Sequence, residues 1–187
     1  MTALSWAWLS TPVGQVSVGC SPAGVSRVRY GAPPTENRVA GRSSENGDDT
    51  DADPTARKLA DLASRELTEY FRGDRRSFDV PVDWAATSGP QREVLQILSA
   101  SVGYGQTVSY GELARRAGLS ADAPVPPART VGKIMGSNPI PVIVPCHRVL
   151  ASVGLGGYSG GAGVEVKRWL LILEGSLPPT LDWQPMG

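Results

Sequence analysis

Strand-like and helix-like patterns occupy separate parts of this chain of 187 residues. In the first thirty residues, apolar and polar positions alternate between two turn segments, which predicts short strands joined as a hairpin. From residue 90 onward, apolar residues recur at helical spacing, and the composition changes at residues 85–89. We therefore expect an α+β unit at residues 1–86, a mainly helical unit at 89–175 and a tail at 176–187.

Three further patterns lie within the N-terminal unit. Residues 31–55 are rich in Pro, Gly, Ser, Asn and Asp, which predicts a mobile loop. Residues 56–71 place leucine and aromatic side chains at helical spacing, and Gly73 is expected to end that helix. The segment 78–84 alternates again and predicts an edge strand, because Pro81 lacks a backbone donor.

The C-terminal unit contains two short predicted helices. Ser109 and Glu112 form a capping-box pattern, in which Ser109 accepts from the third helical amide and Glu112 reaches back to the Ser109 amide. The helix that they open should end near Gly118. A second helix is expected over 128–137, because a residue before proline, here Asn138, avoids the helical region. Two such helices suggest a helix-turn-helix, although the connector between them is long for that motif.

Charge is balanced overall but unevenly distributed. Lysine and arginine together number 18, as do aspartate and glutamate, so the formal net charge is zero. Between Tyr110 and Arg148, five basic residues stand against two acidic ones, a local net of +3, whereas residues 36–53 carry a local net of −4. The chain could thus present a basic face to a phosphate backbone, while scattered solvated charge is the simpler interpretation.

The numbers of cysteine and histidine residues indicate which cellular compartment and which metal sites the chain suits. Cys20 and Cys146 do not suggest a disulfide framework, and they suit a reducing cytoplasm. We expect no signal peptide and no membrane span, because no apolar run approaches about 18 residues. Two cysteines and one histidine cannot fill a four-ligand zinc site, so we expect neither metal nor cofactor. No interface pattern argues against a monomer.

The segment Pro145-Cys146-His147-Arg148-Val149 carries the chemical signal. It follows residues 142–144, which are apolar and expected to be extended. A thiol attacks as the thiolate, and its ordinary pKa of about 8.5 leaves little thiolate at neutral pH. His147 is the only histidine, so it is the one imidazole that could take the proton. Neighbours on a strand point to opposite faces, so the pair needs a turn or a bridging water. Cys20, on a strand, is expected to be an inert buried residue.

With these residues in place, the chain resembles the methylated-DNA–protein-cysteine methyltransferase family, the O6-alkylguanine-DNA alkyltransferases. The resemblance is strong over about residues 90–175, where Pro145 to Val149 matches the family's active-site signature. The other matching segments are Tyr104-Gly105-Gln106-Thr107-Val108-Ser109-Tyr110, Ala128-Arg129-Thr130-Val131-Gly132, Asn138-Pro139, Gly157-Tyr158-Ser159-Gly160-Gly161 and Lys167-Arg168-Trp169-Leu170-Leu171. It implies a ribonuclease-H-like N-terminal domain and a winged helix-turn-helix-like catalytic domain.

The resemblance also implies roles for the catalytic residues. Cys146 would accept the alkyl group from O6-alkylguanine, with O4-alkylthymine left open as a second substrate. His147 would activate the thiol through a water, and Glu174 would hold the histidine. Asn138 would fix the turn beside the site. Because nothing in the chain would hydrolyse the resulting thioether, each molecule should act once.

The implied partner is double-stranded DNA bearing an alkylated guanine, bound in the minor groove with the damaged base flipped out. Arg129 would enter the duplex in place of that base, and the Tyr110 hydroxyl would contact phosphate and donate toward the guanine. The remaining residues expected to contact DNA or the base are Ser109, Thr130, Gly132, Lys133, Arg148, Val149, Tyr158, Ser159 and Gly160.

Two departures and two alternatives stay open at this point. The connector at 120–127 is longer than usual for the family, and an insertion around 162–163 shifts the spacing to Glu174. One alternative is a non-catalytic DNA-damage sensor or regulator with the same fold, although relatives of that kind lack the acceptor cysteine. The other is a thiol hydrolase that uses Cys146 and His147 over many turnovers.

Overall fold

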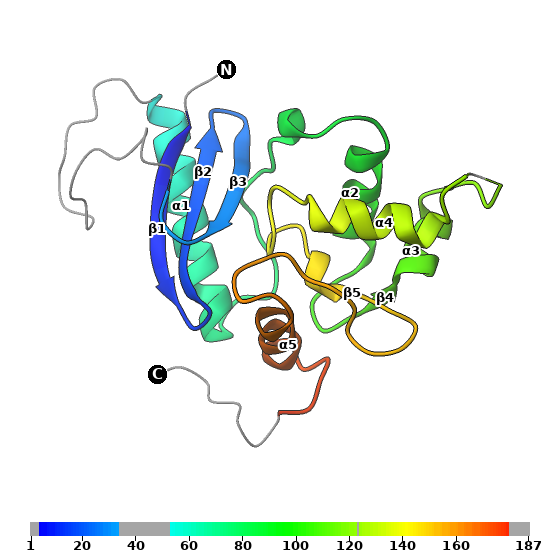
Figure 1. Cartoon of the computed structure of the whole chain (residues 1–187). Helices are drawn as coiled ribbons and strands as arrows, with labels where there is room; N and C mark the ends of the chain where they lie inside the picture. The colour runs from blue at the N-terminus through cyan, green and yellow to red at the C-terminus, as the bar shows by residue number, and fades with distance from the viewer. Residues whose placement is uncertain (1–3, 34–52, 123, 180–187) are drawn as a thin grey trace.

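The computed structural model describes residues 4–33, 53–122 and 124–179. Most of the predicted loop at 31–55 therefore lies outside the described residues, as does the end of the predicted tail. The N-terminal part is a three-stranded antiparallel sheet in the order β1-β2-β3, with one long helix across a face of it (Figure 1). Its elements are β1 (Ser5–Thr11), β2 (Gly14–Ser21), β3 (Gly24–Tyr30) and α1 (Pro54–Arg72).

Local chemistry explains the ends of α1 and confirms the predicted helix. The Asp53 side chain accepts from the backbone N–H groups of Thr55 and Ala56 at 2.8 and 3.2 Å, which satisfies two orphan donors of the first turn. Pro54 begins the helix, where a missing N–H costs nothing. Gly73 ends it in the left-handed conformation at φ 84°. The predicted hairpin is confirmed as well, by the pairing of β2 with β3.

The edge strand predicted over 78–84 is wrong. Within this segment a single parallel bridge joins Val82 to Val25 of β3. The N–H groups of residues 79–80 donate instead to the Glu66 carboxylate of α1, at 3.0 and 3.2 Å. Because those donors are used by a side chain, they cannot extend a ladder. The segment then enters a short 3-10 helix, η2 (Trp84–Ala86).

The C-terminal part is mainly helical, as predicted. Helices α3 and α4 pack closely against each other, and β4 pairs in parallel with β5 beside them (Figure 1). The elements are α2 (Gly89–Ser101), β4 (Val108–Ser109), α3 (Tyr110–Arg116), α4 (Pro127–Gly136), η3 (Cys146–Arg148), β5 (Val149–Leu150) and α5 (Val164–Leu173).

Half of the predicted capping box is present at the start of α3. The Ser109 hydroxyl accepts from the Glu112 N–H at 3.1 Å. The Glu112 carboxylate does not return to the Ser109 amide, because it pairs with Arg115 and Arg116 one turn further along. Oppositely charged neighbours at this spacing therefore replace the second half of the box.

Residues 142–144 form a tight turn, which corrects the expected extended segment. The Val144 N–H donates to the Ile140 carbonyl at 2.9 Å, and Val142 has φ 74°. A β-branched residue in the left-handed region costs of order 1–3 kcal/mol, so the surroundings must hold it there. The Asn138 side chain does so from both sides: it accepts from Ile140 N–H at 3.0 Å and donates to the Val144 carbonyl at 2.9 Å. This turn delivers the chain to η3.

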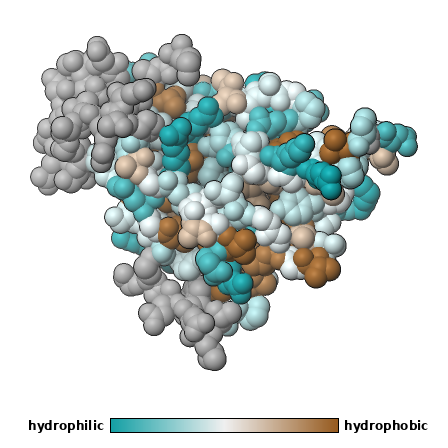
Figure 2. Space-filling view, in the orientation of Figure 1, coloured by the Kyte–Doolittle hydropathy of each residue, from teal (hydrophilic) through white to brown (hydrophobic). Residues whose placement is uncertain are grey.

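The two parts share one core. Their buried apolar residues form a single cluster, and β3 also joins the turn before η3, since the Val28 N–H donates to the Pro139 carbonyl at 2.9 Å. On the face shown in Figure 2, hydrophilic side chains lie over β3 and over α4, and hydrophobic ones form small groups. Among the described helices, none is long and apolar enough to cross a membrane.

Candidate active site

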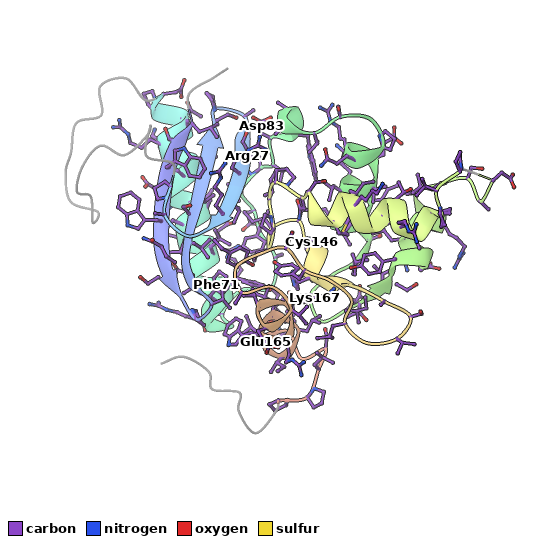
Figure 3. All side chains as sticks on the ribbon, in the orientation of Figure 1. Arg27, Phe71, Asp83, Cys146, Glu165 and Lys167 are labelled. Atoms are coloured by element: carbon purple, nitrogen blue, oxygen red, sulfur yellow. The ribbon has the colours of Figure 1, made fainter. Side chains whose placement is uncertain are left out.

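Cys146 and His147 lie in the 3-10 turn η3, and not on a strand. Two backbone bonds close the turn, from Cys146 N–H to the Val144 carbonyl at 2.8 Å and from Arg148 N–H to the Pro145 carbonyl at 2.9 Å. The opposite-face problem of adjacent strand residues therefore does not arise here. Figure 3 places Cys146 near the middle of the molecule, between β3 and α4.

Cys146 borders a cavity of about 790 Å³ between α3, α4 and the loop after β5. That volume lies within the range of about 300–1,000 Å³ that is usual for small-molecule sites. The cavity therefore has room for a compact ligand beside the sulfur. It gathers seven of the residues predicted from the sequence: Ser109, Tyr110, Arg129, Gly132, Cys146, Tyr158 and Ser159.

A second cavity, of about 330 Å³, reaches the same sulfur from the side of β3. It shares Cys146, Tyr158 and Ser159 with the first cavity. Two residues predicted from the sequence, Asn138 and Gly160, line only this second space. The thiol is 5% exposed, so it is enclosed by protein yet borders both cavities.

His147 is fully buried, and its hydrogen bonding fixes which nitrogen can act as a base. Its Nε2 lies 2.9 Å from Oε1 of Glu174. An ionised carboxylate only accepts, so Nε2 carries the proton and Nδ1 holds the lone pair. Nδ1 has no hydrogen-bond partner in the described part of the chain. Burial lowers the pKa of His147, and the bond to Glu174 only partly opposes this, so the ring is neutral at pH 7.

Glu174, just beyond α5, is the centre of a buried polar cluster. Its carboxylate accepts from Tyr70 at 2.6 Å and from both Nε and Nη2 of Arg148, at 2.9 and 2.8 Å. Burial alone would raise the pKa of Glu174. Hydrogen bonds and charges from His147 and Arg148 outweigh it and lower that pKa to about 2. The carboxylate therefore stays ionised wherever the protein works.

The thiol of Cys146 experiences opposing effects. Burial raises the pKa of the thiol above its ordinary value, and hydrogen bonding by Asn138, the charge of Lys167 and hydrogen bonding by Tyr158 only partly oppose this. Lys167 is completely buried on α5, and its Nζ donates to the carbonyls of Val149 and Gly157 at 2.7 and 3.2 Å. Burial lowers the pKa of Lys167 to about 8. In Figure 3 its label lies below that of Cys146.

Sequence reasoning missed the roles of three residues at this site. Lys167 was noted only as part of a matching segment, although a lysine among apolar helix positions signals a buried cation. Tyr70 of α1 and Tyr30 of β3 reach the site from the N-terminal part. Their partners lie 104 and 128 positions away along the chain, so local patterns could not reveal them.

Arg148, which the resemblance places among the residues that contact DNA, lies inside the protein in this structure. Its guanidinium is buried, holds Glu174 and donates to the Val102 carbonyl at 2.7 Å. The Val149 carbonyl already accepts from Lys167, so it has one lone pair left for another donor. Thr130 and Lys133 lie on α4 but do not line either cavity.

Comparison with known proteins gives the same picture. Residues 89–176 match the model of the 6-O-methylguanine DNA methyltransferase, DNA binding domain. A methylated-DNA–protein-cysteine methyltransferase of Methanopyrus kandleri is 44% identical over 115 residues, which cover 61% of this chain and 79% of that protein. A DNA base-flipping protein of Thermus thermophilus is 36% identical over 91% of this chain and 99% of its own length. The crystal structure of Mycobacterium tuberculosis OGT in complex with DNA is similar with a TM-score of 0.68 at 32% identity, covering 91% of this chain and 93% of that one.

A cysteine beside a buried imidazole and carboxylate, on the wall of a cavity within the matched DNA-binding domain, defines the class: a thiol nucleophile that acts on DNA. The chain belongs to the methylated-DNA–protein-cysteine methyltransferase family. Its function is direct-reversal DNA repair, by transfer of an alkyl group from the damaged base to a cysteine of the protein.

Proposed function

We propose that Cys146 is the acceptor, and that it takes the alkyl group irreversibly from O6-alkylguanine held in the 790 Å³ cavity. The observation that carries this proposal is the position of the sulfur on the wall of that cavity, beside the buried His147–Glu174 pair. O4-alkylthymine is a second candidate substrate, because it presents a similar alkoxy carbon on a smaller base.

Activation of the thiol begins at His147. Its Nδ1 holds a lone pair and lacks a partner, so a water bridging Nδ1 and the Cys146 thiol would relay the proton to the ring. Glu174 stabilises the imidazolium that results, as a buried carboxylate does in hydrolase triads. Asn138 holds the turn that aims the sulfur.

Transfer is a single displacement. The thiolate attacks the alkyl carbon, the S–C bond forms as the C–O6 bond breaks, and the electron pair goes to the guanine, which then takes up a proton. Tyr110 lines the cavity, and burial raises the pKa of its hydroxyl, so the phenol is protonated and able to donate to the departing base. The product is a thioether, so one molecule repairs one lesion.

The DNA partner would approach α4 and the minor groove would face this helix. Arg129 is exposed at the start of α4 and lines the cavity, which suits a guanidinium that fills the space of a flipped base. Thr130 and Lys133 are candidates for phosphate contacts, and Ser109 is another. Gly132, Tyr158, Ser159 and Gly160 would enclose the base, with the Val149 carbonyl reading its exocyclic amine.

The finer architecture belongs to the same proposal. We infer that the sheet with α1 is a ribonuclease-H-like domain, and that α3 and α4 form a winged helix-turn-helix around the long connector. The protein would act as a monomer in the cytoplasm, without metal or cofactor.

Intact-protein mass spectrometry tests the proposal. Incubation with duplex DNA carrying O6-methylguanine should add one methyl group per protein molecule. The gain should vanish in Cys146→Ser and persist in Cys20→Ala, which removes the other thiol as a matched control. Folded protein that binds the duplex but gains no mass would contradict the proposal.

The same measurements separate transfer from a role in binding damaged DNA without transfer, the alternative weighed from the sequence. The presence of Cys146 favours transfer. The alternative predicts that Cys146→Ser binds methylated DNA as tightly as the native protein and that neither changes in mass.

A further inference from the structure

Two tyrosines from distant parts of the chain meet at the second cavity, which Cys146 also lines. Tyr30 ends β3, and Tyr158 lies in the loop that borders both cavities. Their hydroxyl oxygens are 2.8 Å apart, and their rings meet edge to face with centroids 6.4 Å apart. The distance alone allows either hydroxyl to be the donor.

The pair is enclosed tightly. A Cβ atom on Gly160 would lie 2.4 Å from the ring of Tyr30 and 2.7 Å from the ring of Tyr158, so only glycine fits between them. Burial raises the pKa of both phenols, so both remain protonated and can donate. The contact is therefore a fixed part of the site and not a transient touch of two surface side chains.

The pair also reaches the reactive sulfur. Tyr30, Cys146 and Tyr158 all line the second cavity. The Tyr158 hydroxyl acts to lower the pKa of the Cys146 thiol, and the negative charge of the thiolate raises the pKa of both tyrosines. The two hydroxyls and the sulfur thus form one interacting group.

We propose that Tyr30 is a positioning residue that makes Tyr158 a hydrogen-bond donor to the Cys146 thiolate. A thiolate accepts and cannot donate, so the Tyr158 proton must point to the sulfur, and its oxygen must accept from Tyr30. A hydroxyl that accepts one hydrogen bond donates a stronger one, because the two bonds polarise each other. The N-terminal unit would therefore contribute directly to the reactivity of the thiol. This inference rests on the proposed function, since it concerns the same sulfur.

Other ionisable groups face the sulfur, and the test must leave them unchanged. Lys167 approaches from α5, His147 from η3 and Tyr110 from α3. Arg129 of α4 lines the first cavity, and Arg29 of β3 lines the second. Tyr30→Phe removes one hydroxyl and keeps the ring against Gly160, so all five of these groups stay in place.

The experiment measures the pH dependence of Cys146 alkylation by iodoacetamide, followed by intact mass in a Cys20→Ala background. The thiolate displaces iodide, so the midpoint of the rate profile gives the pKa of the thiol without any DNA. Tyr30→Phe should raise that pKa by about half a unit to one unit, which slows the reaction about three- to tenfold at pH 7. Tyr158→Phe should raise it at least as far. Thr68→Val, which removes a hydroxyl bonded within α1, should leave the profile unchanged.

A Tyr30→Phe profile that overlays the parent, with the protein folded, would overturn the proposal and leave Tyr30 as a packing residue. A shift in Tyr158→Phe alone would overturn it in the same way, as would an equal shift in Thr68→Val. Methyl transfer from DNA is measured separately on the same proteins. If the parent fails to transfer methyl while Tyr30→Phe still shifts the thiol pKa, the proposed function fails and this inference stands.

Discussion

The N-terminal sheet and the C-terminal site each bury one cysteine, and the two thiols have opposite surroundings. Cys20 lies on β2 within the apolar core, where burial raises the pKa of its thiol to about 12. Cys146 is also buried, but Asn138, Lys167 and Tyr158 counteract the effect of burial. Residue type and burial are shared, so the difference in chemistry comes from neighbouring polar groups and from the cavities.

Two buried carboxylates repeat this contrast. Glu66 of α1 accepts from backbone N–H groups, which pin a loop in one place, and pairs with the Arg75 guanidinium, which also keeps its proton at every working pH. Glu174 is bonded by ionisable side chains, among them His147 and Arg148. A backbone donor keeps its proton at every working pH, whereas an imidazole exchanges one. Burial of charge is therefore structural in the N-terminal part and, in the proposed mechanism, coupled to proton movement in the C-terminal part.

Among variants that keep the acceptor cysteine, the largest expected effect comes from removing the imidazole. His147→Ala should slow methyl transfer by a factor of about 10²–10⁴, since proton transfer by a positioned side chain contributes that much. The measurement is single-turnover transfer from methylated duplex DNA at pH 7. Raising the pH should recover part of the rate, because hydroxide then deprotonates the thiol. A variant that transfers at the native rate would show that the C-terminal cysteine needs no base, and would break the contrast with Cys20.

Much of the N-terminal fold could be predicted from the sequence. Alternation in the first thirty residues gave the hairpin, and Gly73 marked the end of α1, because each signal is local. The extended conformation predicted for residues 142–144 is wrong for a physical reason: a buried turn and a buried strand are equally apolar. What distinguishes them is the Asn138 side chain, whose bonds to Ile140 and Val144 hold the turn but leave no mark on the apolar pattern of the segment.

The site could be predicted only in part. Cys146 and His147 stood out as residues, whereas Glu174 came from the family resemblance alone. The resemblance puts Arg148 among the residues that contact DNA, and the sequence does not show that Glu174 draws its guanidinium inward. Lys167 is missed as well, although its place among apolar helix positions indicates a buried cation.

The next largest effect is a loss of stability on breaking the buried ion pair between Arg148 and Glu174 of the C-terminal part. Arg148→Met keeps most of the side-chain volume but leaves Glu174 without its permanent cation. Breaking such a pair from one side costs about 3–5 kcal/mol of unfolding free energy, because a buried charge remains uncompensated. Urea unfolding at pH 7 measures it. Exposed Arg115→Met is the control and should cost less than about 1 kcal/mol. Equal losses of unfolding free energy in the two variants would mean that the buried ion pair contributes no more to stability than an exposed one.

A smaller change follows from Lys167→Met, which removes the buried cation that lowers the pKa of Cys146. A thiol pKa raised by about one unit slows transfer about tenfold at pH 7, and the deficit should shrink as the pH approaches the new pKa.

The same lysine also affects stability. The folded-state pKa of Lys167, about 8, lies below its ordinary value of 10.5, so the protonated form opposes folding at neutral pH. That cost should decline in the native protein as the pH rises from about 8 to 10.5, and Lys167→Met should lack this pH dependence. Rate profiles and urea midpoints across the same range check both parts.

The smallest effect is expected from Cys20→Ala. The side chain is fully buried in the apolar core, so truncation should cost about 1 kcal/mol of unfolding free energy through lost contacts. Methyl transfer should keep its stoichiometry and rate, because Cys20 lines neither of the two cavities that Cys146 borders. Cys146→Ala should show the reverse split: no transfer, and a smaller loss of stability, because its sulfur already borders two cavities and leaves little new void. Paired urea and mass measurements on the two variants test whether reactivity and stability are carried by different cysteines. A loss of transfer in Cys20→Ala would show instead that packing in the core of the sheet controls the reaction at Cys146.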